Sequence, residues 1–244
     1  MNNFDVKLLT AEQKNTRRRI LEISFQRNFS HIGSCLGSID LIDAIYKVKK
    51  RDEQFILSNG HAGVALYVIL EKNGMIKDSN IIKKLNVHPD RNLDIGISVS
   101  TGSLGQGLPI ALGMALSNKN ENVYCLVSDG ECAEGSIWET LRIASDNKIN
   151  NLKIIINANG WSGYDSIYFP NLITRFGAFG YNVKTINGHD MNAITQTLNT
   201  ISNNKPMAIF AQTTTDQFPF LKGLYAHYYI MKDNDYRKAL ELLK

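Results

Sequence analysis

Two stretches of the sequence decide the fold: VYCLVSDGE at residues 123–131 and LKIIINANG at residues 152–160. Each begins with an apolar run of strand length and ends in a polar turn, at Asp129-Gly130 and at Asn159-Gly160. Nearly continuous apolar runs are typical of parallel strands that are buried on both faces. The thirty residues from Asp129 to Asn159 leave room for one crossover helix. The two stretches therefore predict neighbouring parallel strands with polar residues at their carboxyl ends.

Outside these stretches, helical patterns alternate with short apolar runs. This rhythm predicts an α/β fold with a mostly parallel sheet and helices on both faces. The strands expected are Gln54–Leu57, Val123–Val127, Leu152–Ile156, Asn182–Ile186 and Met207–Ala211. The helices expected are 10–29, a second one capped by Ser38 with a stripe from Ile39 to Tyr46, one ending at Leu70, Leu104–Leu116, Ser136–Asn147, a polar helix between the last two strands, and one near Asp235–Leu243.

The composition predicts a soluble globular protein. The chain has 244 residues, enough for one large domain, and it is 43% hydrophobic and 20% charged. It contains no apolar run of membrane-spanning length, and Met1–Asp5 shows no signal pattern, so we expect a cytoplasmic protein that does not contact a membrane. Three cysteines without paired spacing (Cys35, Cys125 and Cys132) argue against disulfides and against a zinc site.

The net charge of +4 is spread thinly, with one basic cluster at Arg17-Arg18-Arg19. The cluster lies in a helical pattern, which favours a solvated helix face or a contact with an acidic partner surface over a nucleic-acid site. We therefore expect no nucleic-acid partner.

Polar residues follow four of the expected strands, at His61, Asp129, Asn159 and Thr213. In open α/β sheets the ligand crevice lies at the carboxyl ends of the strands. A carboxylate beside an amide suits a hard divalent cation, and Mg²⁺ in particular takes one or two protein carboxylates together with phosphate oxygens. The free main-chain amides after Asp129 suit a phosphate. These residues predict a site for a metal and a phosphate.

Asp129-Gly130 followed by Asn159 resembles the fingerprint of thiamine-diphosphate enzymes, and Asp129–Gly135 resembles the transketolase branch of that family. Six further segments resemble transketolase in the same order: Ser30–Gly37, Leu57–Ala62, His88–Asp90, Thr101–Gly107, Phe176–Tyr181 and Asn187–Asp190. The resemblance implies that residues 1–244 form one thiamine-diphosphate-binding domain of the kind that holds the diphosphate (the PP domain).

The resemblance also implies roles for individual residues. Asp129, the Asn159 side chain and the Trp161 carbonyl would ligate Mg²⁺ (or Ca²⁺ or Mn²⁺). The diphosphate would be bound by Gly130 and His61, and the aminopyrimidine ring by Gly102 and Leu104.

Further residues are assigned to the substrate and to the subunit interface. His31 and His88 match histidines of the substrate channel, where with His61 they would handle protons, and Glu134 matches a catalytic carboxylate at the interface with a partner. His227 lies where the family has a diphosphate histidine, but its neighbours match poorly, so both a cofactor role and a structural one stay open. His189 is expected to be structural.

The sequence departs from the family at three places. Ser128 stands where glycine is usual, which narrows the approach to the diphosphate, and Ile32 replaces a proline. After Thr215, residues 216–220 replace the usual glycine-rich loop over the cofactor, which favours an unusual substrate.

Transketolase-like chemistry implies transfer of a two-carbon ketol unit from a ketose, free or phosphorylated, to an aldehyde. The domain that binds the pyrimidine is absent from this sequence, so the resemblance implies a partner chain that carries it, in an assembly of two copies of each. One alternative is a subunit that resembles deoxyxylulose-phosphate synthase or a 2-oxo-acid decarboxylase. The other is a subunit without catalysis that serves as a scaffold or holds the cofactor.

Overall fold

A computed structural model describes residues 4–200 and 205–244. The first three residues of the segment Met1–Asp5, and residues 201–204, lie outside the described parts. The described strands form one parallel sheet in the order β1-β2-β3-β5-β4. The strands are β1 (Gln54–Leu57), β2 (Val123–Ser128), β3 (Leu152–Ala158), β4 (Asn182–Asn187) and β5 (Met207–Gln212). All five expected strands are confirmed to within two residues at each end.

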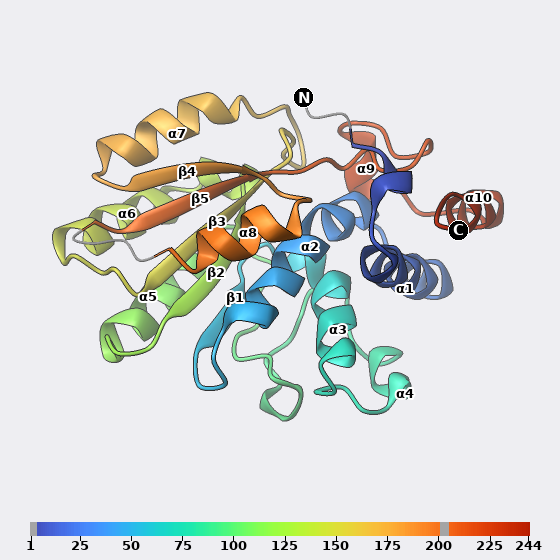
Figure 1. Cartoon of the computed structure of the whole chain (residues 1–244), viewed down its shortest axis with the longest axis horizontal. Helices are drawn as coiled ribbons and strands as arrows, with labels where there is room; N and C mark the ends of the chain where they lie inside the picture. The colour runs from blue at the N-terminus through green and yellow to red at the C-terminus, as the bar shows by residue number, and fades with distance from the viewer. Residues whose placement is uncertain (1–3, 201–204) are drawn as a thin grey trace.

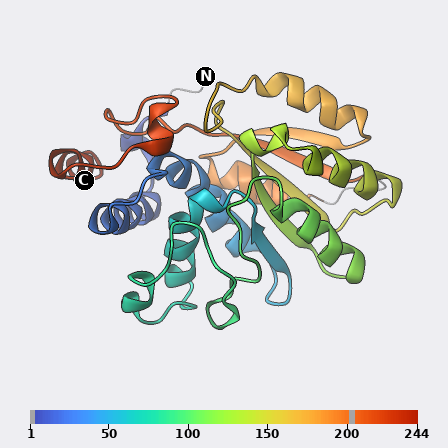
Figure 2. The same cartoon turned by 180° about the vertical axis from the view of Figure 1, so that it is seen from behind.

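Helices cover both faces of the sheet, as predicted (Figures 1 and 2). One face packs against α2 (Ile32–Val48), α3 (Gly63–Lys72) and α8 (Met191–Leu198), and the other against α5 (Gly107–Ser117), α6 (Gly135–Asp146) and α7 (Phe169–Ala178). Alternate side chains of β2 enter the two cores: Tyr124 and Leu126 point to the first, Cys125 and Val127 to the second. The apolar runs in the sequence are continuous because both faces are buried.

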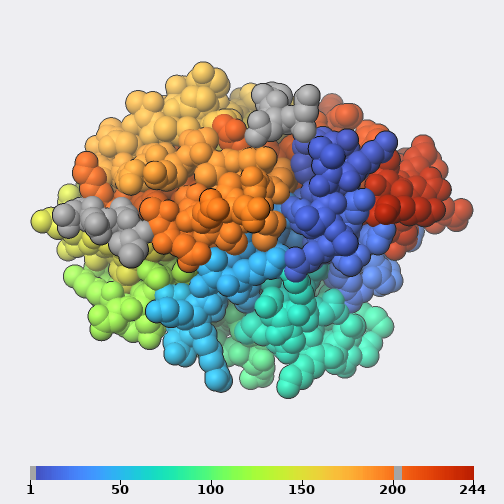
Figure 3. Space-filling view, viewed as in Figure 1, coloured from blue at the N-terminus to red at the C-terminus, as the bar shows by residue number. Residues whose placement is uncertain are grey.

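The remaining elements lie around the ends of the sheet. They are α1 (Ala11–Arg27), α4 (Ser79–Ile82), α9 (Tyr225–Tyr228) and α10 (Asp233–Leu242), with short 3₁₀ helices η1 (Val6–Leu8), η2 (Gly60–Ala62), η3 (Leu93–Ile95) and η4 (Gly130–Ala133). The helices α1 and α10 lie side by side at one end of the molecule (Figures 1 and 3), where the Arg18 guanidinium donates a hydrogen bond to the carbonyl oxygen of Leu243.

The prediction that Ser38 caps the second helix is wrong, because α2 already begins at Ile32 and Ser38 is buried in its interior. The glycines at 33 and 37 lie inside this helix, where they allow close packing. A Cβ atom on Gly33 would lie 3.0 Å from the Cβ atoms of Thr215 and Ala226, in a segment remote in the sequence. Nothing local reveals that contact.

The basic cluster is not a solvated face throughout. The Arg17 side chain is fully buried and forms a bidentate pair with Asp40 of α2, with N–O distances of 2.6 and 3.0 Å. Arg19 is partly exposed and pairs with Glu71 of α3. These arginines attach α1 to its neighbours, so the expectation of a wholly solvated face or of a surface for an acidic partner is corrected for both residues.

One helix boundary and one whole helix also differ from the sequence prediction. The helix expected to begin at Leu104 begins at Gly107, so residues 104–106 belong to a loop. The helix α7 was not expected, although Pro170 in its first turn suits a helix start. Its buried residues are Leu172 and Phe176.

The three cysteines, Cys35, Cys125 and Cys132, are free and buried, which confirms that the sequence pattern does not encode a disulfide framework. Across residues 4–200 and 205–244, the helices are either too short or too polar to cross a lipid bilayer.

Candidate functional site

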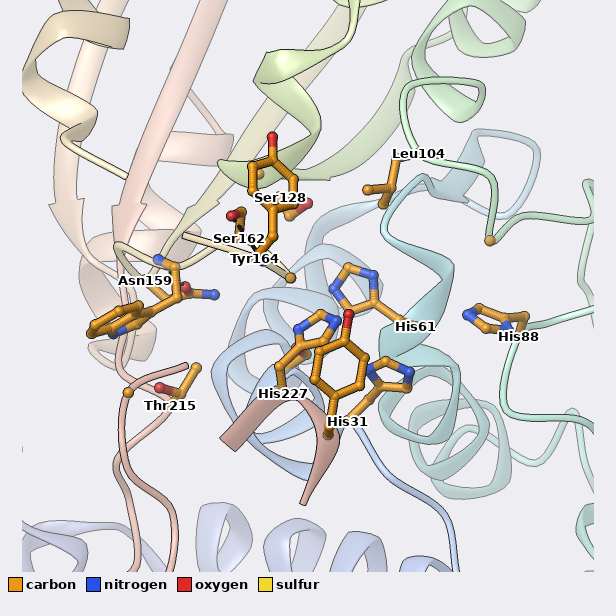
Figure 4. A pocket seen from close by; sticks show the side chains of 17 residues that line it. His31, His61, His88, Leu104, Ser128, Asn159, Ser162, Tyr164, Thr215 and His227 are labelled. Carbon is orange, nitrogen blue, oxygen red and sulfur yellow. Dashed lines mark hydrogen bonds between the residues drawn. The ribbon is translucent and has the colours of Figure 1, made fainter. Parts of the chain in front are cut away.

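A cavity of about 300 Å³ opens at the carboxyl ends of the strands (Figure 4). It brings together residues from segments that are far apart in the sequence, as the fold class predicts. Nine of the candidate site residues line it: His31, His61, His88, Gly102, Leu104, Gly130, Asn159, Trp161 and His227. Two do not: Asp129 is fully buried between Ser128 and Gly130, which do line the cavity, and Glu134 is exposed.

Asp129 directly follows β2, and Asn159 directly follows the neighbouring strand β3, so the predicted placement at adjacent strand ends is confirmed. The Asp129 carboxylate is fully buried, and its two oxygens accept hydrogen bonds from the N–H groups of Gly130 (3.0 Å) and Gly160 (2.7 Å). Burial raises the pKa of Asp129 to about 7. A nearby cation would favour the charged form, so this carboxylate suits a metal site.

The oxygen atoms beside Asp129 match the preference of a hard cation. The Asn159 side-chain oxygen accepts a hydrogen bond of 2.9 Å from the Trp161 N–H, which fixes the turn that carries both residues. Within the described residues, no group of three or more His, Cys, Asp or Glu side chains is arranged to hold a metal. A single carboxylate with amide and carbonyl oxygens fits Mg²⁺ that is bound together with a phosphate.

The site needs glycine at two positions, because neighbouring atoms approach the main chain too closely there for a side chain. Gly102 adopts φ = +141°, and a Cβ atom there would lie 2.9 Å from the His88 ring. A Cβ atom on Gly130 would lie 3.1 Å from the Ser162 Cα atom. The Gly130 N–H, for which the sequence suggests a diphosphate contact, donates to Asp129 in this structure. These positions form a narrow cradle of backbone with space for a ligand beside it.

Four histidines converge on the cavity (Figure 4). The ring centroid of His31 lies 4.6 Å from that of His227, 5.6 Å from that of His61 and 5.9 Å from that of His88. Burial, followed by repulsion from neighbouring histidines, lowers the pKa of His31 to about 4 and that of His61 to about 3. Both rings are therefore neutral near pH 7 and able to donate or accept hydrogen bonds.

His31 has two features of a functional residue. It adopts a left-handed backbone conformation with φ = 63°, which is uncommon outside glycine. Its Nδ1 atom is buried and has no hydrogen-bond partner among the residues that the structure describes. A buried polar atom of this kind in a cavity wall suits a ligand that supplies the missing bond.

His227, whose role the sequence left open, joins this cluster, since its ring lies 5.3 Å from that of His61. Burial lowers the pKa of His227. The cavity is also lined by Tyr164, Thr215 and Tyr228, which sequence reasoning missed. Only Thr215 carried a signal, because it follows β5 closely.

His189 is structural, as expected. Its ring is buried, its Nδ1 lies 2.8 Å from an Asp40 carboxylate oxygen, and its Nε2 accepts a hydrogen bond from the Thr214 N–H. Gln217 accepts from Arg17 and donates to the carbonyl oxygen of Leu36, so the same buried network holds the substituted loop after Thr215.

Ser128, which replaces the usual glycine, lines the cavity, and its N–H and hydroxyl both bond to the Glu131 carboxylate. Glu131 is a further residue that the sequence did not single out. It is fully buried.

Residues 19–223 match the family model described as "Transketolase, thiamine diphosphate binding domain". The chain belongs to the transketolase family. It is 30% identical to one of the subunits named for the apulose-4-phosphate transketolase of Phocaeicola vulgatus, over 97% of this chain and 94% of that protein. It is 37% identical to mouse transketolase-like protein 2, over 75% of this chain but only 33% of the relative.

The solved structures agree with this family. The transketolase of Campylobacter jejuni superimposes with a TM-score of 0.86 at 27% identity, over 99% of this chain and 43% of that enzyme. This transketolase-family chain thus has the α/β fold of the thiamine-diphosphate-binding PP domain, and it spans less than half of the C. jejuni enzyme.

Proposed function

We propose that this chain is the diphosphate-binding subunit of a transketolase-like enzyme, which transfers a two-carbon ketol unit from a ketose to an aldehyde. The observation that carries the proposal is the buried Asp129 carboxylate between Ser128 and Gly130, two residues that line a cavity shared with four histidines. The whole chain, 1–244, acts as one PP-type domain. When bound, thiamine diphosphate stabilises the carbanion that is left when the carbon–carbon bond of the donor breaks.

In this proposal, Asp129, the Asn159 side chain and the Trp161 carbonyl hold Mg²⁺, or Ca²⁺ or Mn²⁺ in its place, against the diphosphate. Gly130, His61 and His227 complete the diphosphate cradle, and Gly102 and Leu104 contact the aminopyrimidine ring. The fit is supported by the all-oxygen donor set and by the narrow backbone cradle described above.

The remaining histidines handle the substrate. His31 has a free buried Nδ1 atom that accepts or donates a hydrogen bond to a substrate hydroxyl, together with neutral His61. His88 is exposed beside the cavity and contacts the substrate from the solvent side. A positioned acid–base group contributes roughly a hundred- to ten-thousand-fold to the rate.

A second chain that carries a pyrimidine-binding domain completes the site. Support comes from the two relatives that are named as transketolase subunits, which this chain matches over nearly their whole length, whereas it spans a third of the transketolase-like protein. Glu134 is exposed, and its Cβ and Cγ atoms pack beside Gly105 on the loop after Leu104, where it would face the partner. An assembly of two copies of each chain follows from a two-fold interface.

Isothermal titration calorimetry tests the metal assignment. Asp129→Ala should abolish binding of thiamine diphosphate with Mg²⁺, whereas the matched variant Asp146→Ala, at an exposed carboxylate of α6, should bind as the wild type does. Unchanged affinity in Asp129→Ala would refute the assignment.

Assays of ketol transfer with and without the partner test the need for a second chain. Turnover by this chain alone at the rate of the pair would contradict that need.

A further inference from the structure

Glu131 occupies an unusual position for a carboxylate. It is fully buried, and among the described parts of the chain it takes part in none of the ion pairs. Burying a charge without a counterion is costly unless hydrogen bonds compensate. Hydrogen-bond donors around the carboxylate therefore have to compensate for its burial.

Four hydrogen-bond donors surround this carboxylate, and they come from three segments of the chain. One oxygen accepts from the Ser58 hydroxyl (2.6 Å) and from the Gly105 N–H (3.0 Å). The other accepts from the N–H (2.9 Å) and the hydroxyl (3.3 Å) of Ser128. Ser58 follows β1, Gly105 lies in the loop before α5, and Ser128 ends β2. A single side chain therefore joins the ends of two strands to the loop Thr101–Gly107.

That loop fits against its surroundings without spare room. A Cβ atom on Gly60 would lie 2.6 Å from the Gly102 nitrogen, and one on Gly107 would lie 2.6 Å from the Ser58 Cα atom. On the far side, the Ser136 hydroxyl donates a hydrogen bond of 2.8 Å to the Gly105 carbonyl oxygen. The main chain of Gly105 is thus held from both sides.

We propose that Glu131 is a positioning residue that fixes the loop Thr101–Gly107 against the ends of β1 and β2, so that Gly102 and Leu104 face the Asp129 side of the cavity at a set distance. The inference deepens the proposed function and rests on it, because this loop is the part that would hold the aminopyrimidine ring. The two oxygens of this one side chain accept from all four donors, so the contact geometry alone joins the loop to both strand ends.

The substitution Glu131→Gln isolates this role. Both serine hydroxyls can rotate and accept a hydrogen bond from the NH₂ group of glutamine. The N–H groups of Gly105 and Ser128 can only donate, and they point to different oxygens of Glu131. The single amide oxygen of glutamine serves one of these two N–H groups and leaves the other facing an NH₂ group. The matched control is Ser58→Ala, which removes a donor and leaves both N–H bonds in place.

Hydrogen exchange tests the positioning without any ligand. The Gly105 amide of the wild-type chain should exchange as slowly as the amides of β2, and peptides covering residues 101–107 should exchange at least about tenfold faster in Glu131→Gln, but not in Ser58→Ala. Fast exchange of the Gly105 amide in the wild type would overturn the inference even if Glu131→Gln failed to fold, as would unchanged exchange in a folded Glu131→Gln.

Calorimetry with two probes tests the link to function. Glu131→Gln should weaken the binding of thiamine diphosphate with Mg²⁺ at least about tenfold, while the binding of inorganic pyrophosphate with Mg²⁺, which probes the Asp129 end alone, stays within about twofold. Equal loss for both probes, or no loss for either, would overturn the positioning role. If the wild-type chain binds neither probe even together with its partner chain, that result contradicts the proposed function, and the exchange result stands separately.

Discussion

The main-chain N–H of His31 donates a hydrogen bond of 3.0 Å to the main-chain carbonyl oxygen of His227, and the two imidazole rings lie edge to face. This contact ties the start of α2 to α9 (Tyr225–Tyr228), and thereby holds the segment around His227 at the cavity. Because the hydrogen bond uses only main-chain atoms, it does not depend on the side chain at position 227. The fold and the chemistry at this position can therefore be tested separately.

We predict that His227→Ala lowers the affinity for thiamine diphosphate by roughly ten- to a hundred-fold, the value of one hydrogen bond to a charged group. The melting temperature should change little, because the main-chain contact remains. Fluorescence titration and thermal unfolding measure the two effects. Tyr225→Ala, at an exposed side chain of the same helix, is the control and should bind normally. Normal binding by His227→Ala would give this histidine a structural role only.

Stability should depend on pH through His31. Burial and the neighbouring histidines lower the pKa of His31 from 6.5 to about 4 in the folded chain. Between these values the unfolded chain binds a proton that the folded chain does not, so the free energy of unfolding falls as the pH decreases from about 6.5 to about 4. His31→Asn, which tolerates the left-handed backbone, should flatten this slope. Urea unfolding at pH 7.5 and 5.0 measures the free energy of unfolding of both proteins. An equal change with pH in the wild type and in His31→Asn would contradict the prediction.

The buried pair of Arg17 and Asp40 should matter far more than a surface pair. Asp40→Asn leaves the Arg17 charge buried without its partner, which costs about 3–5 kcal/mol in the free energy of unfolding. The exposed pair of Asp233 and Arg237 in α10 provides the control, and Asp233→Asn should produce little measurable change. Denaturant unfolding of both variants measures the two changes. Similar losses in the free energy of unfolding would show that the buried pair contributes no more than the exposed one.

Two glycine substitutions should have opposite signs. A Cβ atom on Gly60 would lie 2.6 Å from the carbonyl carbon of Thr101, so Gly60→Ala should destabilise the chain by about 1–3 kcal/mol and displace the loop Thr101–Gly107. Gly113 lies inside α5, where a Cβ atom would meet nothing in the described chain within 4 Å. Gly113→Ala should therefore stabilise the isolated chain by up to about 1 kcal/mol. Thermal unfolding measures both, and stabilisation by Gly60→Ala would contradict the packing described.

The strands and the pair of Asp129 and Asn159 were predictable because their signals are local. A strand buried on both faces must be apolar along its length, and a turn residue that directly follows it must lie at the carboxyl end. The start of α2 was not predictable, since Gly33 serves a contact with Thr215 and Ala226 that only the folded chain creates.

Residues that act through several segments were also beyond the reach of the sequence. The burial of Arg17 depends on Asp40 and Gln217, which other elements supply. The position of Glu131 depends in the same way on donors from three segments. Such side chains resemble ordinary surface charges until the topology is known.

The three buried cysteines can serve as probes of local opening of the fold. Burial raises the pKa of Cys35 to about 12 and that of Cys125 and Cys132 well above the usual value, so a thiol-specific reagent finds no thiolate to attack while the chain is closed. The rate of labelling then reports how often each region opens. Cys125 records opening of the sheet centre and Cys132 that of the turn beside Asp129. A ligand that seals the cavity should slow the labelling of Cys132 more than that of Cys125, and mass spectrometry of the labelled peptides distinguishes the two.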